Sequence, residues 1–272
     1  MAGLSISRAW DETKAVLARD GKLVTSVALA LIVLPAMIFD LIAPPTQLSG
    51  EEPPSWVRLV SMIVALIGIA GQVAIIRLAL QPPILVKDAI EHGFKRLLPA
   101  FAALILFGFV CALLLMPVFL GIAGTESLQA AASGAVPPEV ARALLVVMAL
   151  FVIIGARFQL IMPIASAEPI GPIKMLKRSW QLSKGHYWRL LAFVILTLVL
   201  ALIVVLYIGT ILGGSLVSAA FGQIDQFSVG ALIAGLISGV AQAAFSVVIS
   251  VMLARIYVQL AGAEVGVPNT GT

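Results

Sequence analysis

The sequence predicts an all-α integral membrane protein with six transmembrane helices, arranged as three parallel repeated hairpins that are each preceded by a cytoplasmic amphipathic helix. Hydrophobic residues make up 61% of its 272 residues and charged residues only 11%, about half the charged share of a soluble domain. Mean hydropathy is +1.12, which excludes a disordered chain. Six stretches have the roughly 20 apolar residues that a helix needs to cross a bilayer: residues 23–42, 57–76, 97–122, 143–164, 190–212 and 229–254.

The lysines and arginines lie almost all on one side of these spans. Of the 17 such residues, only Arg58 and Arg142 fall on the opposite side. Because short loops rich in Lys and Arg stay in the cytoplasm, we expect both termini there. The net charge of +4 therefore serves orientation, and no nucleic-acid partner is predicted.

The connections between the spans are too short for a soluble domain on either face. The external ones are a proline-rich run that starts at Ala43 and a run of small residues that starts at Ala123. Neither has the length of a folded unit. We therefore expect a single membrane domain over residues 1–272, with a short C-terminal tail at residues 263–272.

A threefold repeat runs through the chain. Each unit has a polar segment, a glycine with a basic residue after it, an apolar hairpin, and an arginine near the end of its second span. The glycines are Gly21, Gly93 and Gly185, and the arginines are Arg77, Arg157 and Arg255. Each unit has an even number of spans, so all three enter the membrane in the same direction, unlike inverted repeats. The units are expected at about residues 3–82, 83–168 and 169–262.

The clearest amphipathic segment covers residues 169–189, PIGPIKMLKRSWQLSKGHYWR, in which Pro172 suits the first turn of a helix. Helical spacing places Ile173, Leu176 and Trp180 on its apolar side. The polar side carries Lys174, Lys177, Arg178, Gln181 and Lys184. We expect this helix to lie in the interface with its basic groups toward lipid phosphates. The same residues also fit a helix that only buttresses the bundle while its charges fix topology.

The N-terminal segment has a similar pattern, with Ile6, Trp10, Thr13 and Leu17 on its apolar side. Its polar residues are mixed in charge. A shorter segment of the same kind, ILVKDAIEHGFKR, precedes the third span. Each hairpin is therefore expected to follow a helix that lies along the membrane surface.

Residues 163–191, PIASAEPIGPIKMLKRSWQLSKGHYWRLL, resemble a known family. They are similar to the integral membrane domain attached to some bacterial glycerophosphodiester phosphodiesterases, and to six-helix inner-membrane proteins that carry this domain alone. The matching residues are Pro163, Glu168, the Lys-Arg-Ser-Trp run at 177–180, Gly185, Trp188 and Arg189. The resemblance implies a bacterial inner-membrane protein. It implies no catalysis, because the hydrolase chemistry of those fusions belongs to a separate soluble barrel, which this chain has no room for.

The three repeated arginines, Arg77, Arg157 and Arg255, lie within or at the end of a span. An ionisable side chain is costly there unless it faces a polar interior or reaches the interface. One interpretation is that all three side chains extend to the membrane–water interface. The other is that they converge on the pseudo-threefold axis and form a cationic vestibule for a phosphate headgroup or another anion.

Candidate catalytic and metal-binding residues are few. His92 and His186 have no companions in a ligand pattern, and Cys111 is the single cysteine. Glu168 is expected to pair with Lys174 or Lys177 rather than to act as a general acid or base. No nucleophile, base and charge stabiliser occur together. We therefore expect no enzyme activity, no metal and no cofactor.

The last span carries small residues at every fourth position: Ala231, Gly235, Gly239 and Ala243. Such a row allows two helix backbones to approach closely. Gly235 and Gly239 are therefore predicted packing positions. The neighbouring helix belongs either to the same chain or to a second protomer, so a homo-oligomer stays open.

Together these patterns predict a non-enzymatic multi-pass inner-membrane protein of envelope or lipid homeostasis. It is expected to bind anionic lipid or partner membrane proteins at its cytoplasmic face. The candidate headgroup-binding residues are Arg77, Arg157, Arg255, Lys174, Lys177, Arg178 and Lys184. Two alternatives stay open: a transporter or channel for a small anion or lipid-like substrate, and an accessory subunit of a larger membrane complex.

Overall fold

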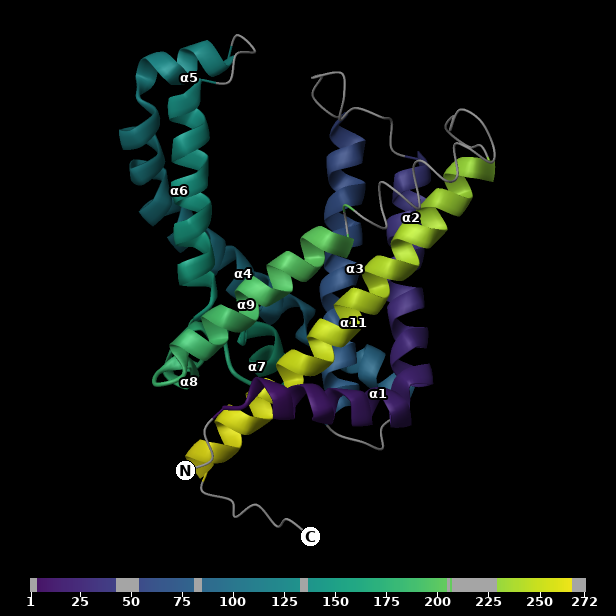
Figure 1. The fold of residues 1–272 in the computed structure, drawn as a ribbon. Coiled ribbons are helices and arrows are strands. Elements are labelled where there is room, and N and C mark those ends of the chain that lie inside the picture. The colour runs from purple at the N-terminus through teal and green to yellow at the C-terminus, as the bar shows by residue number, and fades with distance from the viewer. Residues whose placement is uncertain are drawn as a thin grey trace.

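The computed structural model describes residues 4–42, 54–80, 85–132, 137–204, 206 and 229–265. These residues form helices joined by short turns, without a strand among them, so the all-α class is confirmed (Figure 1). Five helical stretches are long and apolar enough to cross a membrane, or six if α8 and α9 form one bent span. The elements are α1 (Ile6–Ala28), the π-helix η1 (Leu29–Val33), α2 (Leu34–Ile42), α3 (Ser55–Leu80), α4 (Val86–Ala123), α5 (Thr125–Ala132), α6 (Pro138–Gly155), α7 (Ile161–Ala167), α8 (Pro172–Ser183), α9 (Tyr187–Ile203) and α11 (Val229–Val265).

The N-terminal segment and the first span are continuous helix. In Figure 1 the first part of α1 runs across the lower end of the bundle, and the chain then turns up into η1 and α2. The π-helix lies directly before Pro35, which has no backbone N–H and whose ring collides with the carbonyl four residues earlier in a regular helix. The wider turn relieves this conflict, and the N–H of Leu34 donates to the carbonyl of Leu29, five residues back.

Two glycines from other helices lie against the first span. A Cβ atom at Gly71 of α3 would lie 3.0 Å from Leu31 Cβ, and one at Gly239 of α11 would lie 3.1 Å from Val33 Cγ1. At Gly235, the other predicted packing position, a Cβ would meet no described atom within 4 Å. The first span therefore packs between α3 and α11, within one chain.

Substitution Gly239→Leu is expected to lower the stability of the protein, because the new side chain must displace Val33 and Met37 from their packing positions. Overpacking of this kind costs about 1–3 kcal/mol. The matched control is Gly235→Leu, one turn earlier on α11. The melting temperature in detergent should fall for the first variant and change little for the second. Equal losses would mean that the contact at Gly239 does not hold the first span.

Helices α3, α4 and α7 meet at one crossing, and Gly93 of α4 makes it possible. A Cβ atom at Gly93 would lie 2.4 Å from the backbone oxygen of Ala70. Beside it, His92 Nε2 lies 2.9 Å from the carbonyl oxygen of Ser166. The Ser166 hydroxyl donates to the carbonyl of Val73 at 3.2 Å. Polar groups at this depth are thus paired across three helices, as a buried crossing requires.

The predicted fourth span, residues 143–164, is wrong in its second half. Helix α6 ends at Gly155, the next residues form turns, and α7 begins at Ile161. Pro163 explains the break: it cannot donate in the interior of a long helix, and a new start places it in the first turn of α7. Side chains of the following elements satisfy carbonyls near the break. Ser179 Oγ donates to Arg157 at 2.7 Å, and the Tyr187 hydroxyl donates to Ile153 at 3.0 Å.

Helices α8 and α9 are bent by 106° at a short turn. Gly185 lies in this turn with a φ of +82°, a conformation that other residues adopt only with strain. Helix α9 then carries the predicted fifth span as far as Ile203. Of the remainder of that span, residue 205 and residues 207–212 lie outside the described residues. The last span is longer than predicted and continues to Val265.

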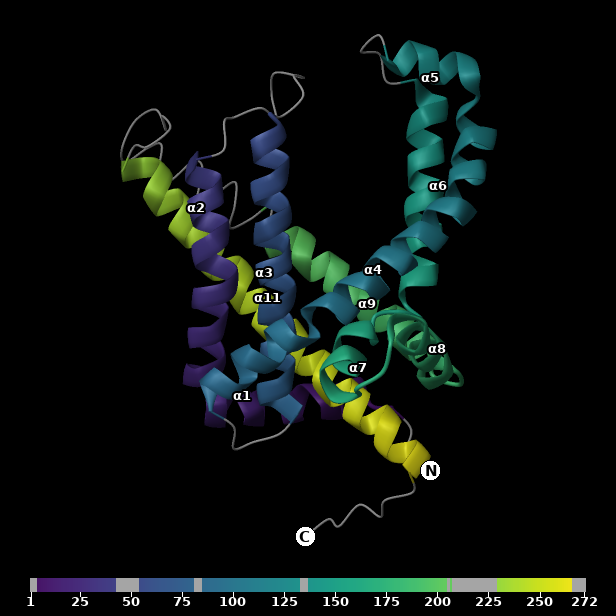
Figure 2. The same cartoon turned by 180° about the vertical axis from the view of Figure 1, so that it is seen from behind.

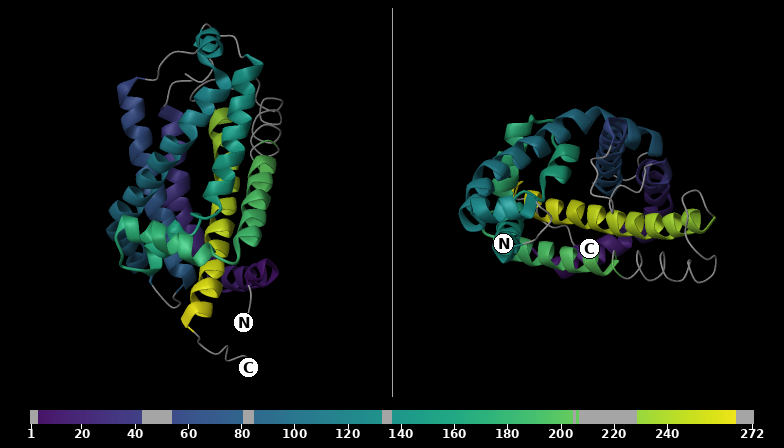
Figure 3. Two further views of the ribbon diagram at one scale, coloured as in Figure 1. Left: turned by 90° about the vertical axis from the view of Figure 1, so that its left-hand side faces the viewer. Right: turned by 90° about the horizontal axis from the view of Figure 1, so that it is seen from above.

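The two ends of the molecule differ in their packing. The outer part of α4, together with α5 and α6, diverges from α2, α3 and α11, as seen from behind in Figure 2. Figure 3 shows α9 beside α11 when the molecule is viewed from above. The large buried cluster lies toward the opposite end, which we call the basic end because α1 and α8 lie there with their lysines and arginines. Large apolar side chains on the diverging helices are exposed, as expected of lipid-facing surfaces: Leu113, Leu114, Met116, Leu144, Leu145 and Met148.

Candidate functional site

The three repeated arginines all lie toward the basic end, and each has different neighbours. Arg157, in the turn after α6, is enclosed by aromatic rings: its guanidinium carbon lies 4.3 Å from the centre of the Trp180 ring and 4.6 Å from that of Tyr187. Such stacking stabilises a guanidinium by about 0.5–2 kcal/mol. The Arg157 side chain therefore fixes the α8–α9 turn against the end of α6.

Arg255 and Arg77 are placed by other elements. Arg255 of α11 donates from Nη2 to the carbonyl of Ala79, near the end of α3, at 2.6 Å. Its Nε atom is buried and has no hydrogen-bond partner among the described residues. Arg77, in the last turn of α3, is half-buried and interacts electrostatically with His92. No contact among the described residues joins two of the three arginines, so their convergence into a vestibule stays a prediction.

The basic residues of α8 divide into two groups. Lys174, Lys177 and Lys184 are exposed, and the structure gives none of them an ion pair among the residues it describes. Arg178 is turned toward the protein instead, where its Nε atom donates to Glu168 Oε1 at 3.2 Å. Three lysines of α8 thus point outward while its arginine anchors the helix.

The predicted apolar side of α8 divides between the protein and the free surface. Leu176 packs against the buried cluster, and the Trp180 ring stacks on Arg157, although Trp180 is 43% exposed. Ile173 is 73% exposed, whereas Met175, Ser179 and Leu182 are buried against the bundle. In a membrane an exposed apolar side chain is as stable toward lipid as toward protein. Ile173 and the exposed part of Trp180 therefore lie on the free surface, on the same helix as the lysines.

Trp188 continues this free surface beyond the turn, and it is 78% exposed. Tryptophan prefers the boundary between headgroups and acyl chains. We call the surface formed by Ile173, Lys174, Lys177, Trp180, Lys184 and Trp188 the α8 surface. Its combination of charge and exposed apolar area distinguishes it from an ordinary solvated loop.

Glu168 is the junction between three elements. It follows α7, and its Oε1 atom accepts from Arg178 of α8 at 3.2 Å and from the Tyr257 hydroxyl of α11 at 2.8 Å. The prediction that Glu168 pairs with Lys174 or Lys177 is wrong. Both lie on the exposed side of α8, whereas Arg178 faces the bundle. The role of Tyr257 was missed, because no local pattern links residues 89 positions apart.

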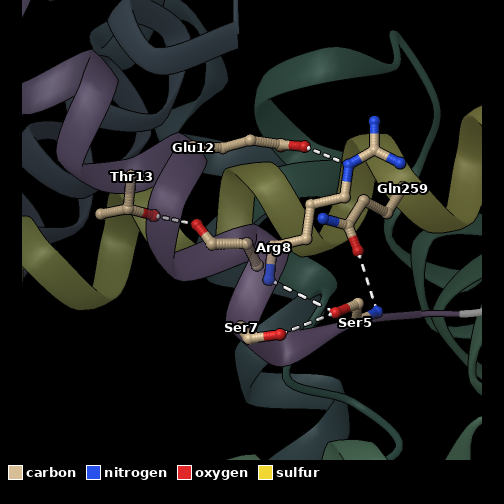
Figure 4. Close-up of polar contacts among 7 residues, drawn as sticks. Ser5, Ser7, Arg8, Glu12, Thr13 and Gln259 are labelled. Carbon is tan, nitrogen blue, oxygen red and sulfur yellow. Dashed lines mark hydrogen bonds and ion pairs between the residues drawn. The ribbon is translucent and has the colours of Figure 1, made fainter.

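The start of the chain is tied to its last helices. Figure 4 shows Ser5, whose backbone N–H donates to Gln259 Oε1 at 3.2 Å, beside the start of α1. Arg189 of α9 donates from Nη1 to the carbonyl of Leu4 at 2.6 Å. The i and i+4 spacing of Arg255 and Gln259 indicated a shared helical face, and both do contact other elements from that face.

Other polar contacts at this end are local. The Ser5 hydroxyl caps α1 by accepting from the N–H of Arg8, whose side chain pairs with Glu12 at 2.9 Å (Figure 4). Exposed pairs of this kind contribute about 0–1 kcal/mol. Within the described ranges, no three His, Cys, Asp or Glu side chains lie close enough to hold a metal ion.

These features define the class of the protein: it is a multi-pass α-helical membrane protein. Its chain belongs to the family described as a domain of unknown function, DUF7847, whose model matches residues 4–260. No curated protein and no solved structure gave a significant match. The resemblance to the membrane domain of glycerophosphodiester phosphodiesterases therefore stays a prediction from the sequence.

Proposed function

We propose that this protein is a non-enzymatic multi-pass protein of the bacterial inner membrane that binds anionic lipid at its cytoplasmic face and so supports envelope or lipid homeostasis. The α8 surface is the observation that carries the proposal. It combines the exposed lysines Lys174, Lys177 and Lys184 with the exposed side chains of Ile173 and Trp180. A helix with basic and apolar groups on one free surface suits the boundary between phosphates and acyl chains.

The orientation of α8 supports the same proposal. Helix α9 carries no charged residue after Arg189 in its first turn, and α8 is bent from it by 106°. If α9 crosses the bilayer, α8 therefore lies along the membrane surface. At that depth the lysine ammonium groups reach the phosphates, and a basic residue near an anionic surface contributes about 1 kcal/mol. The positive-inside rule assigns this surface to the cytoplasm.

Helix α8 is also held firmly enough to present a defined surface. Arg178 is bound by Glu168, and the Ser179 hydroxyl donates to the carbonyl of Arg157. The aromatic rings of Trp180 and Tyr187 enclose the Arg157 guanidinium. A preorganised surface loses less side-chain freedom when a lipid binds.

The proposal predicts a lipid preference that depends on α8. Wild-type protein extracted with native lipid should retain phosphatidylglycerol over phosphatidylcholine in native mass spectrometry. The variant Lys174→Gln/Lys177→Gln/Lys184→Gln should lose at least about tenfold of this preference, since three contributions of about 1 kcal/mol are removed.

The matched control is Lys14→Gln/Lys22→Gln/Lys87→Gln, which removes the same number of positive charges from exposed positions on α1 and α4. It should keep most of the preference. Equal retention by wild type and the α8 variant would contradict the proposal. A partner protein that replaces lipid on wild type alone would favour the accessory-subunit alternative, with the α8 surface as its docking site.

A further inference from the structure

An apolar cleft of about 720 Å³ separates α9 from α11, and α1 borders it at the basic end. Pockets for small ligands have volumes of about 300–1,000 Å³. Six of its lining residues show its character: Ser7, Trp10, Phe193, Thr197, Phe245 and Met252. The two helices run side by side in the view from above in Figure 3, so the cleft lies between two membrane helices.

The residues that line the cleft indicate which chemical class of ligand it can bind. None of the described residues that line the cleft is charged, and the polar side chains among them are the hydroxyls of Ser7 and Thr197. An ion or a sugar would lose its hydration there without replacement. A hydrocarbon chain has no such hydration to lose, and the walls of the cleft are themselves apolar. The occupant that a bilayer supplies at this depth is an acyl chain.

The residues at the basic end of the cleft indicate which headgroup the acyl chain carries. Arg189 lies in the first turn of α9, four residues before the lining residue Phe193, so both lie on one helical face. Its side chain is exposed apart from the donation to Leu4. Trp10, also in the lining, is 44% exposed and belongs to a residue type that prefers the headgroup boundary. A phosphate next to the acyl chain would therefore lie beside a guanidinium, its preferred partner.

We propose that the cleft between α9 and α11 binds one acyl chain of an anionic phospholipid, with the phosphate of that lipid at Arg189. This site is separate from the α8 surface and shares no residue with it. In the cleft, a lipid that enters sideways from the bilayer is bound through its acyl chain. The α8 surface, in contrast, contacts lipid headgroups. The proposal for the cleft and the proposal for the α8 surface can therefore be tested separately.

The test uses full-length protein in phosphatidylcholine vesicles doped with a phosphatidylglycerol that carries a photoactivatable diazirine in one acyl chain. After illumination, labelled peptides should come from α9 and α11 residues that line the cleft. The filled variant Ala241→Phe/Ala244→Phe should lower labelling of these peptides about tenfold. The control Val240→Phe adds the same side chain to an exposed position of α11 outside the lining, and should leave the labelling unchanged.

A melting temperature for each variant separates loss of the cleft from loss of the fold. Equal labelling of wild type and a folded, filled variant would overturn the proposal. So would a wild-type protein whose cleft peptides carry no label while the same probe labels other membrane-facing peptides, because the lipid would then not be the occupant. The variant Arg189→Gln should lower labelling by the anionic probe but not by a diacylglycerol with the same diazirine chain. An equal response to both probes would overturn the assignment of the phosphate.

The triple glutamine variant of α8 should label in the cleft as wild type does, and the filled variant should keep the share of the phosphatidylglycerol preference that the α8 lysines supply. These results distinguish the two sites. Cleft labelling that disappears in the α8 variant would overturn the separate site and make α8 the origin of both signals.

Discussion

Replacement of Gly93 by alanine is expected to destabilise the protein more than the same change at any other glycine in the described helices. The new Cβ atom would lie 2.4 Å from the backbone oxygen of Ala70, and a backbone atom cannot move aside as a flexible side chain can. Helices α3 and α4 must therefore separate. The cost should reach or exceed the upper part of the range of about 1–3 kcal/mol for overpacking. The measurement is the melting temperature in detergent, together with the fraction of monodisperse protein.

The control for this substitution is Gly108→Ala in the same helix. A Cβ atom at Gly108 meets nothing within 4 Å, and alanine has the higher helix propensity. Its melting temperature should stay equal to that of wild type or rise slightly. Similar losses at Gly93 and Gly108 would contradict the close crossing and would point to a general effect on α4.

Replacement of Glu168 by alanine is expected to have the second largest effect. The carboxylate accepts from Arg178 and Tyr257, which belong to α8 and α11, so its removal breaks two contacts between elements. Hydrogen bonds to a charged group contribute about 1.5–3 kcal/mol each, and partial exposure of this pair reduces that value. A loss of about 2 kcal/mol is expected in unfolding experiments. Hydrogen exchange should also become faster in α8.

Two further variants make the result specific. Glu168→Gln keeps an acceptor for the Tyr257 hydroxyl but loses the charge that attracts Arg178, so its stability should be intermediate. Glu139→Ala removes an exposed carboxylate from its pair with Arg142 at 3.2 Å, and should cost about 0–1 kcal/mol. If Glu139→Ala were as damaging as Glu168→Ala, the junction of α7, α8 and α11 would have no special role.

Length and hydropathy were sufficient to predict the helical class and the approximate spans. They could not predict where helices continue or break. No proline separates the N-terminal segment from the start of the first span, so α1 covers both and the helix continues through η1 into α2. Pro35 and Pro163 were visible in the sequence, and each marks an irregularity: the π-helix before α2 and the break between α6 and α7. Whether a proline widens a helix or ends it depends on the residues packed around the backbone, and therefore on the tertiary fold.

The candidate site was predicted in part, for a physical reason. The composition of α8 was evident, but its orientation was not, since an apolar residue in a membrane protein can face either lipid or protein. Ile173 faces outward, Trp180 is 43% exposed while its ring stacks on Arg157, and Met175 and Leu182 face inward. Glu168 was noticed, yet its partners depend on which side of α8 reaches the bundle. The parallel hairpin repeat stays a prediction.

The contacts at Leu4 and Ser5 have a consequence for biosynthesis. These residues are synthesised before their partners, Arg189 and Gln259, which follow 185 and 254 residues later. The segment before α1 therefore stays without these two contacts until α9 and α11 have been made. Its docking depends on helices far along the chain, and a product truncated before α11 would lack the contact with Gln259.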